Sequence, residues 1–503
     1  MTARELLLAM ADALPKGQLP AIPGAGLDVP CTAVTHDSRQ VKPGSVFVAL
    51  PGEKADGAAF APQAIASGAV AIVAERPAST PVDAPWIVVS DARLALALLA
   101  AEFFGHPSRQ MKVIGTTGTN GKTTTSYVMH SIFEAAGIRC GLMGTVTYRI
   151  GDRELAATRT TPEAPEVQSF MRQMVDAGCG ACVMEVSSHA LAMRRVDGIR
   201  FAAGVFTNLT RDHLDFHQNM ENYFAAKRRL FEMLPADAPA VINVDDPRAA
   251  SLVEIAGRPV TYAVTKDADV TPGPLSFALR GLEFDVRMPQ GVAHVKSKLV
   301  GKPNVYNILA AAGTTAAVGI PIKAIEQGLQ KLSEVPGRFE VVSSSDDDIT
   351  VVVDYAHTDD ALRNLLETAR ALASRRLITV FGAGGDRDKT KRPLMGMVAA
   401  RLSDVVVITS DNPRGEDPAR IIEEVKRGAE PESRQGNAEV LAVADRRDAI
   451  LQAVDRASRG DVVLIAGKGH EKYQDIGGRI TQFDDVAVAR EALEARRVKT
   501  RVG

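Results

Sequence analysis

The chain of 503 residues contains only four cysteines, and its 59 basic and 61 acidic residues leave a formal net charge of only −2. A charge this close to zero gives no bulk electrostatic attraction to nucleic acid or to an anionic membrane. Cys179 and Cys182 have the spacing of a redox pair or of half a zinc site. Because Cys31 and Cys140 provide no second pair at ligand spacing, we interpret Cys179 and Cys182 as small residues that lead into a strand.

Long apolar segments are also missing from the sequence. The segment 94–104 is interrupted by Glu102 and is shorter than the ~18 residues that a membrane span requires. The first residues lack the basic start and the apolar block of a signal peptide. We therefore expect a cytoplasmic protein that neither inserts into a membrane nor binds nucleic acid.

The clearest positive signal is a glycine-rich segment, 115–125, between a short apolar run and a helical pattern. We expect a strand over 111–114 and a helix over 126–136. A glycine-rich turn between a strand and a helix points backbone N–H groups and the positive end of the helix at an anion. The segment therefore predicts a binding site for a nucleoside triphosphate.

Individual residues of this segment suit particular parts of the nucleotide. Lys122 would reach the β- and γ-phosphates, and the hydroxyl of Thr123 would hold Mg²⁺. The strict Walker pattern fails, because Thr116 stands where it requires glycine, five positions before Gly121. The alternative is an ordinary glycine turn, which the Gly-Lys-Thr sequence in this context makes the weaker interpretation.

The length and the 46% hydrophobic content suit about three domains. Apolar runs alternate with helical patterns throughout, so we expect three α/β domains: a small N-terminal one over 1–107, a central P-loop domain with a doubly wound sheet over 108–335, and a Rossmann-like one over 336–503. The remaining predicted strands are 46–50, 69–74, 181–186, 203–206, 240–244, 350–354, 377–381, 405–409 and 461–466. The remaining predicted helices are 61–67, 94–104, 221–234, 308–318, 359–374 and 418–428.

Polar clusters follow the predicted strands of the second and third domains. They are 185–189, 207–213, 354–357, 382–388, 411–414 and 467–471. An open doubly wound sheet collects functional residues in this way, at the carboxyl ends of its parallel strands. Glu185 comes directly after an apolar run, where a P-loop fold places a carboxylate that binds Mg²⁺ or positions water. The alternative for Glu185 is a salt bridge at the strand end.

Residue type alone leaves two interpretations for three further features. Lys227 lies within an apolar helical stripe, where a lysine commonly extends its ammonium group to water (snorkels). The alternative is a buried lysine with a lowered pKa, which can take up CO₂ as a carbamate and then bind a hard metal ion. Asn304 and Asn307 could hydrogen-bond an adenine, although capping of the following helix is favoured. The polar segment 35–39 is typical of a turn.

Four of these segments resemble signatures of the Mur ligases, a family of bacterial cell-wall synthesis. They are 118–124, 184–189, 207–215 and 354–357. The resemblance runs in order along essentially the whole chain. In addition, the segment 411–414, Asp-Asn-Pro-Arg, is similar to the amino-acid selectivity motif of the members that add meso-diaminopimelate.

The resemblance implies an ATP-dependent ligase of peptidoglycan precursor synthesis, with Mg²⁺ as cofactor and UDP-N-acetylmuramoyl-L-alanyl-D-glutamate as acceptor. The D-glutamyl γ-carboxylate would attack the γ-phosphate of ATP, and the amine of meso-diaminopimelate would attack the resulting acyl phosphate. The first domain would bind the UDP-sugar, the second ATP and the third the incoming amino acid. We expect a monomer whose partners are these small molecules.

The resemblance also implies roles for individual residues. Thr123 and Glu185 would hold one Mg²⁺, and His213 would hold a second together with a carbamylated Lys227. The role of Lys227 as a carbamate overrides the snorkelling interpretation. The implied catalytic residues are Lys122, Glu185, His213 and Lys227. ATP would contact Gly118, Thr119, Asn120, Gly121, Lys122, Thr123, Thr124, Asn304, Arg338 and His357. The UDP-sugar substrate would contact Ser38, Thr160, Thr161, Ser187, Met193 and Arg195.

The implied diaminopimelate pocket comprises Arg387, Asp411, Asn412, Pro413, Arg414, Gly467 and Glu471. Arg387 and Arg414 carry planar donor forks that match carboxylates. Diaminopimelate has a carboxylate at its far end, where lysine has only hydrogen. Asp411 and Glu471 suit its ammonium groups.

The chain departs from the family pattern at Glu53 and Lys54, where a His-Gln pair is common, at Met193, where relatives carry glutamine, and at Asp359, which replaces a proline.

Rival functions are a sister ligase that adds L-lysine or D-alanyl-D-alanine, a folylpolyglutamate synthase, a nucleotide-gated binding protein with slow ATPase activity, and a P-loop kinase. Arg414 argues against the lysine-adding ligase, and the segments 37–39 and 184–189 argue against the synthase. Phosphate release that depends on the amino acid and yields an amide would exclude the binding protein and the kinase.

Overall fold

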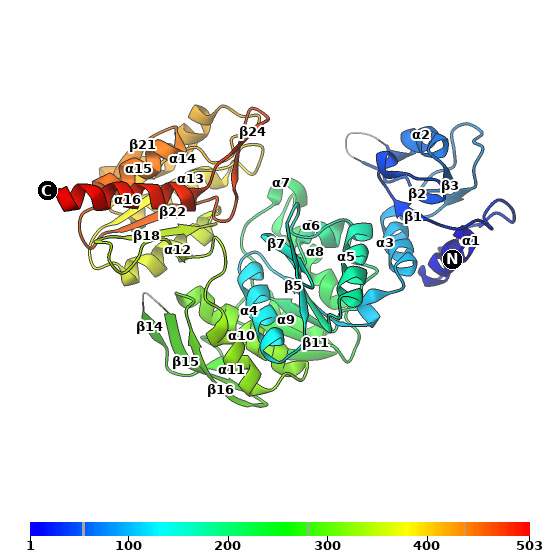
Figure 1. Cartoon of the computed structure of the whole chain (residues 1–503), viewed down its shortest axis with the longest axis horizontal. Helices are drawn as coiled ribbons and strands as arrows, with labels where there is room; N and C mark the ends of the chain where they lie inside the picture. The colour runs from blue at the N-terminus through cyan, green and yellow to red at the C-terminus, as the bar shows by residue number, and fades with distance from the viewer. Residues whose placement is uncertain (53–55, 279–280, 437, 503) are drawn as a thin grey trace.

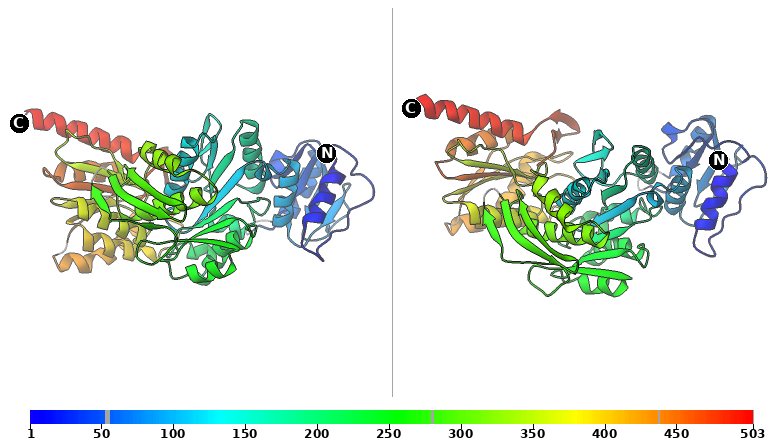
Figure 2. Two further views of the ribbon diagram at one scale, coloured as in Figure 1. Left: turned by 90° about the horizontal axis from the view of Figure 1, so that it is seen from below. Right: turned by 60° about the horizontal axis from the view of Figure 1, so that its bottom comes forward.

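Three α/β bodies lie in a row in the computed structural model, which describes residues 1–52, 56–278, 281–436 and 438–502 (Figure 1). The two termini lie at opposite ends of the elongated molecule, and both views of Figure 2 keep the same order of bodies. This arrangement confirms the predicted three-domain α/β fold, whereas the exact boundaries remain predictions. Glu53 and Lys54 lie outside the described residues. Within the described part, no helix is long and apolar enough to cross a membrane.

The N-terminal body is a parallel sheet covered on both faces. Its strands, in spatial order, are β1 (Ala33–Thr35), β2 (Ser45–Val48), β3 (Ala69–Ala74) and β4 (Trp86–Val88). Its helices are α1 (Ala3–Ala13), α2 (Ala61–Ala66), α3 (Ala92–Phe103) and the 3₁₀ turns η1 (Ser38–Gln40), η2 (Gly57–Phe60) and η3 (Pro107–Arg109). Side chains alternate along each strand, so Val46 and Val48 pack with α1 and α3 while Phe47 packs with α2. The predicted strand 69–74 is confirmed.

The central body is built on an eight-stranded sheet in the order β12-β11-β10-β5-β9-β6-β7-β8. Its strands are β5 (Lys112–Thr117), β6 (Cys140–Met143), β7 (Thr147–Ile150), β8 (Arg153–Ala156), β9 (Ala181–Glu185), β10 (Ala203–Phe206), β11 (Pro239–Asn243) and β12 (Arg258–Tyr262). Only β7 runs against the others: it pairs antiparallel with β6 and β8, and every other neighbouring pair is parallel. Its helices are α4 (Lys122–Ala135), α5 (Ala164–Asp176), α6 (Ser188–Ala192), α7 (Leu214–His217), α8 (Met220–Glu232), α9 (Ala249–Ile255), α10 (Lys302–Ala317) and α11 (Ile322–Lys331).

Both faces of the central sheet are buried, which explains the continuous apolar runs of its strands. On β5, Ile114 packs with α4 and α10, whereas Val113 packs with α5, α6 and α8. Cys182 lies in β9, as expected, and burial raises the pKa of its thiol. The polar clusters that follow β5, β9 and β10 therefore emerge at one edge of a fully covered sheet.

A small antiparallel sheet extends the central body and was absent from the sequence expectations. Its strands are β13 (Thr271–Pro272), β14 (Ser276–Ala278), β15 (Gly281–Met288) and β16 (Gly291–Ser297). Leu282, Phe284 and Val286 are buried in the same core as residues of α10 and α11. Their spacing of two is the sequence signal that identifies β15.

The C-terminal body has a six-stranded sheet in the order β17-β18-β22-β19-β20-β21, parallel except for β17. Its strands are β17 (Glu340–Val341), β18 (Thr350–Asp354), β19 (Leu377–Phe381), β20 (Val405–Ile408), β21 (Glu439–Ala442) and β22 (Val462–Ala466), with a separate hairpin of β23 (Tyr473–Ile476) and β24 (Arg479–Gln482). The helices α12 (Asp359–Leu372), α13 (Lys391–Leu402) and α14 (Pro418–Arg434) cover one face, and α15 (Arg446–Arg456) and α16 (Asp485–Val502) cover the other.

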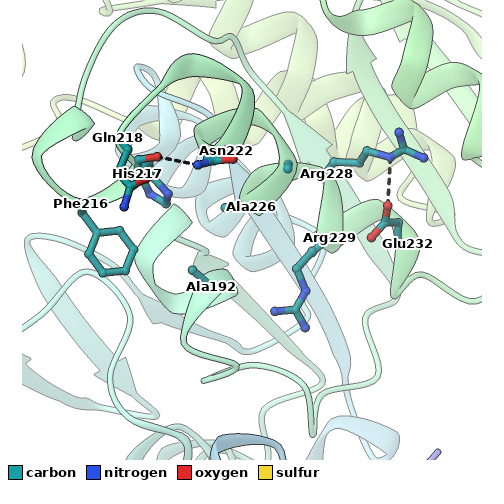
Figure 3. Close-up of a pocket in the computed structure, with 10 residues that line it drawn as sticks. Ala192, Phe216, His217, Gln218, Asn222, Ala226, Arg228, Arg229 and Glu232 are labelled. Carbon is teal, nitrogen blue, oxygen red and sulfur yellow. Dashed lines mark hydrogen bonds and ion pairs between the residues drawn. The ribbon is translucent and has the colours of Figure 1, made fainter. Parts of the chain in front are cut away.

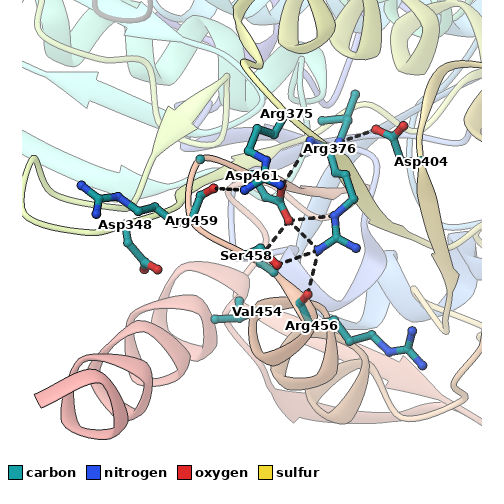
Figure 4. Close-up of polar contacts among 12 residues, drawn as sticks. Asp348, Arg375, Arg376, Asp404, Val454, Arg456, Ser458, Arg459 and Asp461 are labelled. Carbon is teal, nitrogen blue, oxygen red and sulfur yellow. Dashed lines mark hydrogen bonds and ion pairs between the residues drawn. The ribbon is translucent and has the colours of Figure 1, made fainter. Parts of the chain in front are cut away.

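Polar contacts hold the amino-terminal edge of this sheet (Figure 4). Asp461, immediately before β22, accepts hydrogen bonds from Arg376 Nε at 3.0 Å and Nη2 at 2.7 Å, and Arg376 immediately precedes β19. The backbone N–H of Ser458 donates to the same carboxylate at 2.8 Å. These contacts fix the starts of two neighbouring strands, so their opposite ends, which carry the polar clusters, are held side by side.

Three helix boundaries differ from the sequence prediction by more than one or two residues. Helix α10 begins at Lys302, with Pro303 in its first turn, and its N-cap Gly301 makes no side-chain cap hydrogen bond. Asn304 and Asn307 therefore lie inside the helix, and the prediction that they cap it is wrong. Helix α4 begins at Lys122 rather than at residue 126, and α14 continues through its internal Pro431 to Arg434.

Candidate functional site

The glycines of the phosphate loop are sterically required where β5 passes into α4. Gly118 and Gly121 have φ of 147° and 87°, in the region that favours glycine. A Cβ on Gly118 would lie 1.8 Å from Thr207 Oγ1, and one on Gly121 would lie 2.4 Å from Asn307 Oδ1. A larger residue at either position would therefore have a strained backbone and would force Thr207 or Asn307 to move.

The polar cluster that follows β10 holds this loop in shape. The backbone oxygen of Asn208 accepts from Thr119 N–H, and its Oδ1 accepts from Asn120 N–H, each at 2.9 Å. The hydroxyl of Thr207 donates to the carbonyl of Asn120 at 2.6 Å. One function of the segment 207–213 is therefore to support the loop next to it.

Two lysines converge on the phosphate loop. Nζ of Lys122 and Nζ of Lys227 both donate to the carbonyl of Gly118, at 3.0 and 2.7 Å. Lys227, on α8, is only 1% exposed and lies 4.4 Å from the ring centre of Tyr223, so the snorkelling interpretation is wrong. Burial, followed by the neighbouring Lys122 ammonium, lowers the pKa of Lys227 well below its usual value, which favours a neutral and nucleophilic amine.

Glu185 ends β9 as predicted and is 1% exposed. Its Oε1 accepts from the backbone N–H of Thr145 at 2.8 Å, and its Oε2 accepts from the Thr145 hydroxyl at 3.0 Å. Among the residues that the structure describes it makes no ion pair, so the salt-bridge alternative is wrong. Lone pairs that two hydrogen bonds leave free on a buried carboxylate suit a hard cation.

The residues expected to bind metal fit Mg²⁺ to different degrees. The Thr123 hydroxyl and the Glu185 carboxylate are oxygen ligands of the kind that Mg²⁺ takes. Burial lowers the pKa of His213 to about 3 despite the charge of Asp212, so its ring is neutral, as a ligand must be. Lys227 as an ammonium cannot bind a cation and would do so only as a carbamate. No group of three His, Cys, Asp or Glu side chains suited to a metal occurs in the described parts of the chain.

The C-terminal body contributes side chains to the phosphate loop. Arg338 Nη2 donates to Thr123 Oγ1 at 3.2 Å, and its guanidinium lies 4.5 Å from the ring centre of Tyr355. The ring of His357 is 4.6 Å from that of Tyr355. Asn304 lies on α10 and accepts a hydrogen bond from Asn307, whose Oδ1 faces Gly121. The expected ATP residues therefore surround one end of α4.

Five of the six residues expected to bind the UDP-sugar form one group. The Thr161 hydroxyl donates to the backbone oxygen of Glu185 at 2.8 Å and accepts from Ser187 N–H at 3.1 Å. Arg195 donates to the Thr161 carbonyl and to the sulfur of Met193, and Thr160 meets the Thr145 hydroxyl at 3.0 Å.

Ser38 does not join this group in the described contacts. It donates to Gln63 at 3.2 Å within the N-terminal body. Burial lowers the pKa of the neighbouring His36. The charges of Glu163 and Arg159, which belong to the central body, raise and lower that pKa respectively. Asp37 caps the 3₁₀ turn η1, so the predicted turn over 35–39 is confirmed.

The carboxyl ends of β20 and β22 bring together most of the expected diaminopimelate residues. The amide of Asn412 donates to Glu471 Oε2 at 2.8 Å, and a Cβ on Gly467 would lie 3.1 Å from Asp411 Oδ2. Arg414, at φ 51°, donates to the carbonyl of Gly385 at 2.8 Å.

Of the two remaining expected residues, Pro413 lies against this group and Arg387 does not. The carbonyl of Pro413 would be 1.9 Å from a Cβ on Gly385, so the two loops are in close contact. Arg387 is exposed and donates to the carbonyl of Asp386, apart from the others.

One buried residue of this pocket was not predicted to be functional. Lys468 has no exposed side-chain surface, and its Nζ lies 2.9 Å from Asn412 Oδ1 and 3.4 Å from Asp411 Oδ1. The sequence signal for it was its place in the cluster 467–471, directly after a buried strand.

A surface hollow of 580 Å³ lies away from these groups (Figure 3). Residues of α6, α7 and α8 line it, on the side of α8 that faces away from Lys227. Its polar side chains are engaged with the protein: Arg228 pairs with Glu232 at 2.9 Å, and Asn222 donates to the carbonyl of His217 at 3.1 Å. We assign no function to it.

Comparisons with known proteins agree on one family. Three family profiles match: Mur ligase family, catalytic domain, over 30–104; Mur ligase middle domain over 116–315; and Mur ligase, glutamate ligase domain, over 337–469. A UDP-N-acetylmuramoyl-L-alanyl-D-glutamate--2,6-diaminopimelate ligase of Solibacter usitatus is 47% identical over 92% of this chain and 93% of its own. A ligase of the same name from Gloeobacter violaceus is 48% identical over 93% of this chain and 95% of its own length. A solved structure of a ligase with this name covers 99% of both chains, with a TM-score of 0.68 and 34% identity.

Proposed function

Because this chain belongs to the Mur ligase family, we propose that it is an ATP-dependent ligase that adds meso-diaminopimelate to the D-glutamate of UDP-N-acetylmuramoyl-L-alanyl-D-glutamate, in peptidoglycan precursor synthesis. The observation that carries this proposal is the 47–48% identity to ligases named for that reaction, over more than nine-tenths of both chains. The pocket at the ends of β20 and β22 is consistent with it, because Arg414 and Glu471 offer one charge of each sign to a zwitterionic substrate.

In the first step, the γ-carboxylate of the acceptor attacks the γ-phosphate of ATP. The ammonium of Lys122 and the guanidinium of Arg338 offset the negative charge that spreads over the transferring phosphoryl group. The Thr123 hydroxyl and the Glu185 carboxylate would hold Mg²⁺, which supplies further charge compensation and aligns the phosphate oxygens. Thr145 keeps Glu185 oriented through two hydrogen bonds.

Lys227 acts in this proposal as a carbamate. Its neutral amine adds to CO₂ and loses one proton, which replaces a potential cation with a carboxylate-like anion beside Lys122. That anion and the neutral ring of His213 would together hold a second Mg²⁺. The support for this step is the burial of Lys227 and its 2.7 Å contact with the phosphate loop.

In the second step, the amine of diaminopimelate attacks the acyl phosphate and releases phosphate. Arg414 and Arg387 would bind the far carboxylate, while Asp411 and Glu471 would bind ammonium groups. The group around Thr161 and Arg195 would hold the peptide arm of the UDP-sugar, with Ser38 near the uridine. A monomeric, cytoplasmic enzyme is part of the same proposal.

Phosphate release tests this function. The protein is mixed with ATP, Mg²⁺ and UDP-N-acetylmuramoyl-L-alanyl-D-glutamate, and then with meso-diaminopimelate, L-lysine or no amino acid. We expect rapid release and an amide product only with meso-diaminopimelate, and weaker preference in Arg414→Ala. Arg420→Ala, on the exposed side of α14, is the matched control and should behave as the unaltered protein. Equal release in all three mixtures would refute the ligase assignment.

A further inference from the structure

Lys468 is a fully buried lysine at the centre of the amino-acid pocket. It follows Gly467, whose φ of 117° turns the chain at the end of β22. Its Nζ lies 3.4 Å from Asp411 Oδ1 and 3.6 Å from Glu471 Oε2, with the ring of Tyr473 beneath it at 5.5 Å. Removal of a buried ammonium from between two carboxylates would leave uncompensated buried charge, which is costly.

The orientation of Asn412 depends on this lysine. Its Oδ1 accepts from Lys468 Nζ at 2.9 Å and from the backbone N–H of Asp475 at 3.0 Å. With the oxygen held on that side, its Nδ2 is the group that donates to Glu471 at 2.8 Å. Lys468 and the Asp475 N–H therefore together determine which way the amide faces, and through it where the carboxylate of Glu471 lies.

Lys468 also sets the charge of the pocket. Burial, followed by the charge of Asp411, raises the pKa of Glu471, and Lys468 opposes that rise. Without this cation, the two carboxylates would repel each other and the pocket would carry one more negative charge. Such a pocket would favour a substrate with net positive charge, such as L-lysine, over diaminopimelate, whose two ammonium and two carboxylate groups cancel.

We propose that Lys468 is a positioning residue that determines amino-acid specificity: its buried ammonium orients Asn412 and balances Asp411 and Glu471, so that the pocket selects a net-neutral diamino dicarboxylate. The inference rests on the proposed function, because it assumes that this pocket binds the incoming amino acid. It differs from the role of Arg414, which would contact the substrate carboxylate directly.

The test compares Lys468→Met with Lys468→Gln in the full-length enzyme. Gln can still donate a hydrogen bond to Asn412 but carries no charge, whereas Met loses both. We expect both variants to raise KM for meso-diaminopimelate about tenfold and to lower the preference for it over L-lysine at least about tenfold, with kcat changed less than about twofold. Lys472→Met, which removes an exposed lysine four positions away, is the matched control and should leave both values unchanged.

Two readouts separate the possible failures. The Kd for ATP, whose expected contacts do not include Lys468, shows whether a variant is folded. If the Met variant does not fold, the Gln variant decides the question. A folded Gln variant with unaltered KM and preference overturns the role of the charge. If the unaltered enzyme shows no preference for meso-diaminopimelate, or Arg414→Ala keeps that preference, the pocket assignment fails. If the unaltered enzyme and Arg414→Ala behave as expected and only the Lys468 variants show no effect, the inference about Lys468 alone fails.

Discussion

Gly121 illustrates how the phosphate loop depends on single residues. Gly121→Ala would force a non-glycine residue to φ 87° and its Cβ against Asn307. Backbone strain of this kind costs about 1–3 kcal/mol, so we expect ATP affinity to fall by about 5- to 150-fold, measured by calorimetry. Gly24→Ala is the control, because a Cβ there meets no atom within 4 Å and should leave ATP binding unchanged. Equal ATP affinity in both variants would contradict the steric argument.

Lys227 gives a second prediction at the scale of one residue. Under ¹³CO₂, carbon-13 NMR of the unaltered protein should show one carbamate resonance that is missing in Lys227→Met, because the buried amine is the neutral nucleophile. Activity of that variant should fall roughly 10²–10³-fold, as when one group that stabilises a transition state is removed.

Lys323→Met, in which an exposed lysine of α11 is replaced, controls for the loss of any lysine and should keep both the resonance and the activity. A resonance that persists in Lys227→Met would assign the carbamate to another lysine.

Among the helices, α13 and α14 are joined through one buried arginine. The side chain of Arg392 is 0% exposed and donates to Glu416 and Glu424, each at 2.8 Å. Arg392→Met would leave both carboxylates without their buried cation, so we expect the free energy of unfolding to fall by about 3–5 kcal/mol at pH 7, measured by urea denaturation. Arg420→Met also loses a contact with Glu424, but an exposed one, and should change stability by less than about 1 kcal/mol.

The same cluster predicts a pH dependence. Hydrogen bonds from Arg392 hold the pKa of Glu416 at about 2, below its usual value of 4.5. A lowered folded-state pKa stabilises the fold above the unfolded-state value, and that stabilisation disappears as the pH falls from about 4.5 to about 2. Unfolding free energies measured across this range should therefore fall less steeply in Arg392→Met than in the unaltered protein. Parallel slopes would show that Glu416 is not responsible.

How far the sequence predicted each element depended on how local its cause is. Strands such as β10 and β18 were predicted to the residue, because buried parallel strands are apolar runs bounded by polar residues. Helix α10 begins earlier than expected, because Gly301 and Pro303 start it without a polar cap. The clusters at the strand ends located the site, but Lys468 was not recognised, since its importance comes from its distance to Asp411 and Glu471 in space.

At the scale of the whole molecule, the central and C-terminal bodies meet through polar contacts. Arg211 pairs with Asp359 at 3.4 Å and donates to Thr390, and Asn120 of the phosphate loop donates to Asp360 at 2.9 Å. The unusual residue Asp359 is therefore a bridge between bodies, and as the first residue of α12 its charge is also favoured by the helix dipole.

Asp359→Asn should weaken this bridge. Partly exposed ion pairs are worth up to about 1 kcal/mol and are screened by salt. We therefore expect small-angle X-ray scattering to show that the unaltered protein becomes less compact as salt concentration rises, and that the variant responds less. Asp346→Asn, in the exposed loop between β17 and β18, is the control and should respond as the unaltered protein does. An identical response of all three proteins would contradict a role for Asp359 in holding the bodies together.

The steric fit of Gly118 and Gly121 has a consequence for inhibition. A compound whose contacts are confined to the backbone of this loop would bind a surface that selection cannot easily alter. A substitution at either glycine that blocked the compound would also collide with Thr207 or Asn307 and deform the loop that holds the nucleotide. Resistance to such a compound would then have to arise elsewhere in the chain or through the compound's uptake and removal.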